Sequence, residues 1–138
     1  MGDAVSVKTT WLIENRVIYL HLIGDVTIEE IEATSTQVLQ MFEQSAHQLV
    51  HVIHDATDLD NLPTKLKALA DVTSTVWNHQ KMGWTVAFNV QKPVLGFLGN
   101  MLSKLFRTRY RIVNTRQDAL DFLAHVDVSL PQDDNLIN

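Results

Sequence analysis

The sequence predicts an α/β domain with a single mixed β-sheet of about five strands and about four helices. Short, largely apolar stretches recur along the chain, as expected for strands, and segments with helical spacing separate all of them except the first two. The 138 residues are 46% apolar and 20% charged, which suits one domain with one core. Strands separated by helices usually pair in parallel. We therefore expect an N-terminal antiparallel hairpin followed by largely parallel strands.

The elements are expected in the order β-β-α-β-α-β-α-β-α. The first strand alternates between apolar and polar residues, as in a half-buried strand, whereas the second is almost wholly apolar. The polar Glu14-Asn15 pair between them is placed for a tight turn. The expected strands cover 5–13, 17–23, 49–54, 84–90 and 110–113, and the expected helices cover 27–45, 63–77, 93–106 and 115–126.

Capping signals predict where the helices begin. Thr27 and Glu30 have the spacing of a capping box, in which each side chain accepts from the other residue's backbone. Proline is favoured at the first position of a helix, so Pro63 and Pro93 are expected to open the second and third helices. Thr115 repeats the capping pattern before the last one. We expect the domain to span 1–128, followed by a flexible tail over 129–138.

Three segments resemble the STAS domain family. They are the apolar second strand with Thr27 after it, the stretch Val52-Ile53-His54-Asp55-Ala56-Thr57-Asp58-Leu59, and the closing segment 116–123. The resemblance covers 5–126 and is closest to the SpoIIAA-like branch, whose members are often stand-alone proteins. It implies the predicted sheet architecture and a regulatory, non-enzymatic role through binding.

The chain departs from this family at the start of the expected second helix. Anti-sigma-factor antagonists of the family carry an Asp-Ser-Ser-Gly stretch there, with one serine phosphorylated. The present sequence has Pro63-Thr64-Lys65-Leu66 instead, with Thr64 where the first serine would be and Lys65 in place of the phosphorylated one. A kinase switch is therefore not expected here, and whether Thr64 is phosphorylated stays open.

The polar stretch after the third strand is the first candidate binding site. Ligands of open α/β sheets bind beyond the carboxyl ends of strands, and helix N-termini attract anions. The same residue types are also favoured in loops for their own backbone contacts, which is the structural alternative. The stretch lacks the glycine and the terminal glutamate of an EF-hand, so calcium is not expected. The candidate residues are Asp55, Thr57, Asp58, Asn61, Thr64 and Lys65.

The segment 92–116 is the second candidate, as an interaction surface. It contains six basic residues and no acidic one, whereas the whole chain has a net charge of −5. We expect it to dock a protein partner or a second copy of the chain, and Gly96 and Gly99 would let that surface approach closely. Contact with anionic lipid is the alternative function, and a core helix with solvated basic ends is the structural one. The candidate residues are Phe97, Met101, Lys104, Leu105, Arg107 and Arg109.

No catalytic or metal-binding pattern accompanies these segments. The sequence has no cysteine, and a strand would point His51 and His54 to opposite faces, with His47 too far away to complete a metal site. Motifs of nucleophilic serines and of phosphate-binding loops are also missing. Nucleic acid is not expected, because the chain is acidic and lacks a stacking platform beside its arginines. The sequence thus predicts a cytoplasmic, non-enzymatic module without cofactor or metal, which recognises a protein partner or a small ligand.

Overall fold

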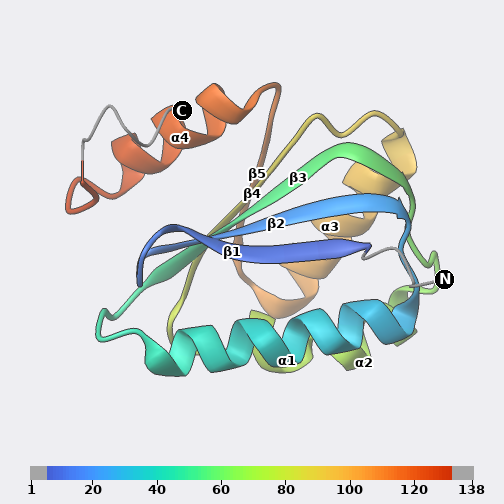
Figure 1. Cartoon of the computed structure of the whole chain (residues 1–138). Coiled ribbons are helices and arrows are strands. Elements are labelled where there is room, and N and C mark those ends of the chain that lie inside the picture. Colours follow the sequence, from blue (N-terminus) through green and yellow to red (C-terminus); the bar gives the residue numbers. More distant parts are fainter. Residues whose placement is uncertain (1–5, 132–138) are drawn as a thin grey trace, which may run out of the picture.

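The protein is described by a computed structural model in which residues 6–131 are placed (Figure 1). It contains one five-stranded sheet and four helices, as the sequence predicts. The strands are β1 (Val7–Ile13), β2 (Val17–Asp25), β3 (Val50–Asn61), β4 (Met82–Phe88) and β5 (Arg109–Val113), and the helices are α1 (Ile28–Gln44), α2 (Leu66–Trp77), α3 (Pro93–Phe106) and α4 (Arg116–Val126).

The strands lie side by side in chain order, β1-β2-β3-β4-β5. β1 pairs with β2 antiparallel, and every later pair is parallel. This arrangement confirms the predicted mixed sheet. Helices α1, α2 and α3 pack on one face, while α4 covers part of the other (Figure 1). The sheet therefore has two different cores, one beneath each helix layer.

The first turn and the start of the first helix lie where the sequence predicts them. Asn15 lies in the hairpin turn with φ +66°, a conformation that asparagine tolerates better than most residues. The Thr27 hydroxyl accepts from the Glu30 backbone amide, and the Glu30 carboxylate accepts from the Thr27 amide at 2.8 Å. The predicted capping box is confirmed, and α1 begins directly after it.

The expected boundary between the third strand and the second helix is wrong. β3 continues through the polar stretch to Asn61, because Ala56 and Leu59 are buried and the strand stays paired with the end of β2. Pro63 does not open α2, which begins only at Leu66. A proline favours extended backbone at the residue before it. Pro63 therefore lengthens the extended segment that follows β3, and the helix starts only after it.

The chain beyond α4 is anchored to the sheet. Asp127, the C-cap of α4, accepts from His51 Nε2 at 2.8 Å and pairs with Arg16 at 3.4 Å. Arg16 also contacts Ser129, and Leu130 is buried in the core beneath α4. The packed core thus reaches beyond the expected boundary at residue 128. The rest of the expected tail, from residue 132 onward, lies outside the described residues.

Candidate functional site

The aspartates predicted as a binding loop lie on strand β3 instead. Asp55 points to the sheet face that carries α4, where its carboxylate accepts from the Tyr19 hydroxyl at 2.6 Å and from the Thr57 amide at 2.9 Å. Burial raises the pKa of Asp55, but these hydrogen bonds outweigh burial, and the pKa is lowered overall. Burial raises the pKa of the Tyr19 hydroxyl most, and its hydrogen bond to Asp55 raises this pKa further. Asp55 is therefore an ionised, internally bonded group.

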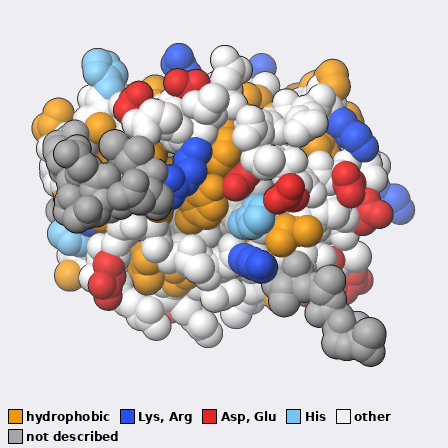
Figure 2. All heavy atoms as spheres, turned by 45° about the horizontal axis from the view of Figure 1, so that its top comes forward, with side chains coloured by type: hydrophobic (Ala, Val, Ile, Leu, Met, Phe, Trp, Pro, Cys, Tyr) orange, Lys and Arg blue, Asp and Glu red, His pale blue; other side chains and the backbone are white. Residues whose placement is uncertain are grey.

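The neighbouring candidates also find partners within the chain. Asp58 lies 2.7 Å from His21 Nε2, and Thr57 Oγ1 accepts from the Asn89 side chain at 2.8 Å. Asn61 donates to Asp25 at 2.7 Å and accepts from Lys92 at 3.2 Å. Figure 2 looks onto the α4 side of the molecule, where acidic and histidine side chains lie beside hydrophobic ones.

These bonds favour the structural interpretation of this stretch. They join the carboxyl ends of β2 and β3 to the segment that follows β4. Thr64 and Lys65 are exposed and lie beyond the end of the strand, before α2. The structure thus brings the four strand residues together and leaves Thr64 and Lys65 apart on the connector. A binding role for this set stays a prediction.

The second candidate segment forms a helix with two apolar sides. Leu95, Leu98 and Leu102 are buried against the rest of the protein. A second set (Val94, Phe97, Met101 and Leu105, here called the α3 stripe) follows helical spacing on the outward side. Phe97 and Leu105 are 59% and 57% exposed. This short helix therefore exposes three large apolar residues, Val94, Phe97 and Leu105, in addition to those that it buries in the core of the protein.

The basic residues of this segment do not all lie beside the stripe. Lys104 and Arg107 lie at the C-terminal end of α3 and are exposed. Arg109 lies on β5, where residues alternate between the two sheet faces. Since Tyr110 faces α3, Arg109 and Arg111 face α4, and the Arg111 guanidinium lies 5.0 Å from the centre of the Phe122 ring. Arg109 is thus separated from the other predicted surface residues.

The two glycines of α3 serve the protein's own packing. A Cβ on Gly96 would lie 3.2 Å from the Ile112 side chain, and one on Gly99 would overlap the Tyr110 hydroxyl. Both partners belong to β5. The close approach expected from these glycines therefore occurs, but to the sheet edge of the same chain and not to an outside partner.

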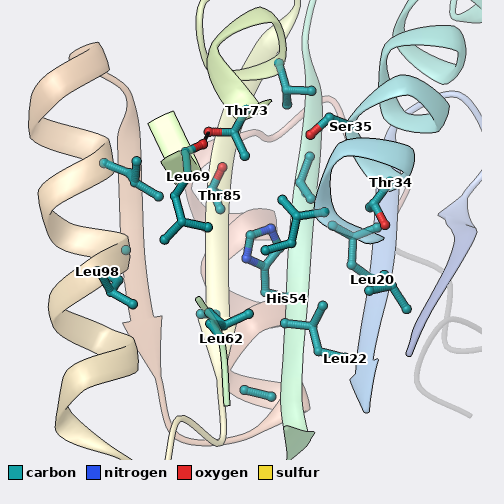
Figure 3. A pocket seen from close by; sticks show the side chains of 18 of the residues that line it. Leu20, Leu22, Thr34, Ser35, His54, Leu62, Leu69, Thr73, Thr85 and Leu98 are labelled. Atoms are coloured by element: carbon teal, nitrogen blue, oxygen red, sulfur yellow. Dashed lines mark hydrogen bonds between the residues drawn. The ribbon is translucent and has the colours of Figure 1, made fainter. Parts of the chain in front are cut away.

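A cavity of about 160 Å³ lies between the sheet and helices α1, α2 and α3, at a place where no site was expected (Figure 3). Ala56 and Ala87, which line it from the neighbouring strands β3 and β4, are small residues. Its lining contains no charged aspartate, glutamate, lysine or arginine. The polar residues that line it are Thr34, Ser35, His54, Thr73, Thr85 and Tyr110.

His54 lies at the centre of this cavity (Figure 3). It is half-buried by surface area, yet burial lowers its pKa from 6.5 to about 4, because the surface it retains faces the cavity and not bulk water. The ring is therefore neutral near pH 7, with one nitrogen that donates and one that accepts. A signal existed in the sequence, namely a histidine and a threonine on the inward face of otherwise apolar strands.

Within residues 6–131, no group of three histidine, aspartate or glutamate side chains is arranged to hold a metal ion. No helix in this part of the chain is both long enough and apolar enough to cross a bilayer.

Comparisons with known proteins identify the fold. The chain matches no protein-family model, and no curated protein is similar to it in sequence. Its architecture is that of the SpoIIAA-like α/β fold. A crystal structure of an uncharacterised DUF3478-family protein from Shewanella loihica PV-4, described as having a SpoIIAA-like fold, has a TM-score of 0.61. It is 14% identical, and the match covers 89% of this chain and 98% of that one.

Two further structures are those of SpoIIAA itself. The unphosphorylated form, described as an anti-sigma factor antagonist, has a TM-score of 0.58 at 14% identity, and the match covers 88% of this chain and 98% of that one. The phosphorylated form, described as a Bacillus cell fate determinant, has a TM-score of 0.55 at 11% identity, covering 85% and 98%. The predicted fold is thereby confirmed over nearly the whole length of these proteins.

Proposed function

We propose that the chain is a non-enzymatic regulatory module that docks a protein partner on the α3 stripe. The observation that carries this proposal is the second apolar side of α3, in which Phe97 and Leu105 are more than half exposed. Large apolar side chains anchor protein interfaces when they enter a partner's pocket. The stripe runs along the helix with the spacing by which an amphipathic helix meets a complementary groove.

Charge defines the chemistry of the partner. Lys104 and Arg107 flank the C-terminal end of the stripe, and the segment 92–116 contains no acidic residue. Complementary charge steers association and suppresses wrong partners. The partner therefore presents apolar side chains together with acidic ones.

The same charges disfavour a second copy of the chain as the partner. In a two-fold dimer, the same patch of both subunits meets itself. Since 92–116 contains no acidic residue, Lys104 and Arg107 would find no opposite charge in that patch of the second copy. A different protein is the better match, and the homodimer becomes an outcome that the test can detect.

The structural neighbours support a regulatory role in coarse terms. SpoIIAA is described as an anti-sigma factor antagonist, a protein that acts on another regulatory protein. This chain shares the fold but has Pro63-Thr64-Lys65-Leu66 where the resemblance places the phosphorylated stretch. Docking through α3 would not depend on that stretch. Association with anionic lipid remains the alternative for the same stripe.

A glutamate at either position 97 or position 105 is expected to abolish partner capture. Phe97→Glu and Leu105→Glu each place a charge in an apolar contact, and we expect the affinity for the partner to fall at least tenfold, about 1.4 kcal/mol, and the captured amount to fall with it. Both side chains are exposed, so folding should be unaffected. The measurement is affinity capture from native lysate with quantitative mass spectrometry.

Val128→Glu is the matched control. Val128 is 87% exposed and comes shortly after α4, the helix that covers the sheet face opposite α3. This variant should capture as much partner as the wild type. Equal capture by Phe97→Glu and Val128→Glu would overturn the proposal, as would a wild-type protein that forms a dimer or binds anionic vesicles through Phe97 and retains no other protein.

A further inference from the structure

We propose that the cavity beneath the sheet is a binding site for a small, uncharged and mainly apolar molecule that carries one hydroxyl or carbonyl group. The cavity lies on the opposite face of β3 from Asp55 and is separate from the α3 stripe. It therefore adds a second binding function to the proposed docking surface. Three properties carry the inference, namely its size, its lack of charge and its unpaired polar groups.

The size admits a ring of about six atoms. The cavity volume is about 160 Å³, and an engineered apolar cavity of about 150 Å³ in another protein binds benzene. The walls are mostly leucine, valine and alanine side chains, which give dispersion contacts without directional demands. A monocyclic or short branched molecule fits this space, whereas a long acyl chain does not.

The absence of charge in the lining excludes an ionised ligand. No lysine, arginine, aspartate or glutamate lines the cavity. His54 is the one titratable group at its centre, and burial keeps that ring neutral near pH 7. An ion moved into such a site would lose its hydration without gaining a partner. The ligand is therefore neutral.

Unpaired polar groups indicate that the ligand has a polar end. Thr85 is fully buried, and its hydroxyl has no hydrogen-bond partner. His54 lies on the adjacent strand, diagonal to Thr85 on the same sheet face, and no described residue bonds its ring. Buried polar groups are almost always paired, so unpaired ones are expected to meet a ligand or water. Together, the hydroxyl and the ring offer both donors and acceptors.

Thr73 provides a comparison within the same cavity. Its side chain also lines the space, but its hydroxyl donates to the Leu69 carbonyl at 2.6 Å. The Thr34 hydroxyl is likewise bonded, to the Glu30 carbonyl at 2.8 Å. Among the three threonines that line the cavity, only Thr85 has an unpaired hydroxyl, and it lies on the sheet side, on the strand beside His54.

The test uses phenol as the probe and the methyl signals of the lining residues as the readout. We expect phenol to shift the NMR signals of Leu20, Leu69 and Leu98 saturably, whereas benzoate, which carries a charged carboxylate on the same ring, should not. Thr85→Val removes the hydroxyl at nearly constant volume and should weaken phenol at least tenfold without weakening benzene. Thr73→Val is the matched control and should change phenol binding less than twofold.

Three results would overturn the proposal. One is a wild-type protein whose lining signals do not respond to phenol, which would mean that the space is filled by water or by repacking. Another is equal binding of benzoate and phenol, which would contradict the neutral site. The third is an equal loss in Thr85→Val and Thr73→Val. Because the first two results come from the wild-type chain, they do not depend on whether a variant folds.

Discussion

His54→Leu is expected to prevent a loss of about 3 kcal/mol that the free energy of unfolding otherwise undergoes between pH 6.5 and about pH 4. Burial lowers the pKa of this ring from 6.5 to about 4 in the folded protein. Between these two pH values the unfolded chain binds a proton that the folded chain does not, so acid favours unfolding. At about 1.4 kcal/mol per pH unit, the contribution is intact above pH 6.5 and is lost progressively as the pH falls to about 4.

Urea denaturation between pH 4 and pH 7 measures this effect. His54→Leu should flatten the curve, since leucine suits an apolar cavity wall and does not titrate. His47→Leu, at an exposed histidine in the turn before β3, should follow the wild-type curve. A His54→Leu protein that is as acid-sensitive as the wild type would show that the ring is solvated in the folded state. Some slope should remain, because burial also lowers the pKa of His51 despite its bond to Asp127.

Asp127→Ala is expected to lower the free energy of unfolding by about 2 kcal/mol, because it leaves a buried ring donor unpaired. His51 is buried, and its Nδ1 accepts from the Trp84 amide at 2.9 Å. Its Nε2 therefore carries the hydrogen and donates to Asp127 at 2.8 Å. The same carboxylate pairs with Arg16 at 3.4 Å. One side chain thus ties the end of α4 to the sheet.

Asp121→Ala is the matched control for this anchor. Asp121 lies on α4 and is exposed, and among residues 6–131 it accepts only from Gln117, at 2.8 Å. Such a surface pair is worth about 0.2–0.5 kcal/mol. Equal destabilisation by the two variants would contradict the anchor. Burial would raise the pKa of Asp127, but bonds from Ser129 and His51 lower it to about 2. Its contribution should thus be intact above pH 4 and lost as the pH falls toward 2.

The fold was predictable from the sequence because its strands and helices alternate with distinct periods. The capping box at Thr27 and the proline at the start of α3 placed two helix starts correctly. The end of β3 was not predictable in this way. Aspartate and asparagine are rare in strands, so the polar stretch after Asp55 suggested a loop. Only the pairing with β2 and the burial of Ala56 and Leu59 identify it as a strand.

The candidate sites were predictable only in part. The apolar and basic character of 92–116 pointed to α3, on which Phe97 and Leu105 are exposed, while docking on this helix stays a prediction. The sequence could not separate Arg109 from them, because this depends on which face of β5 each residue takes. The cavity was missed, because its walls come from all five strands and from three helices. Empty space depends on how side chains from distant segments fit together, which no local pattern records.

A photocrosslinking amino acid placed on the α3 stripe tests the central claim most directly. Benzoyl-phenylalanine at position 97 replaces an exposed aromatic ring by a larger one. The same residue at position 128 samples an exposed site shortly after α4, the helix on the sheet face opposite α3. We predict that irradiation in native cells gives one discrete heteromeric product from position 97 and none from position 128. No product from position 97, or the same products from both positions, would contradict docking on α3.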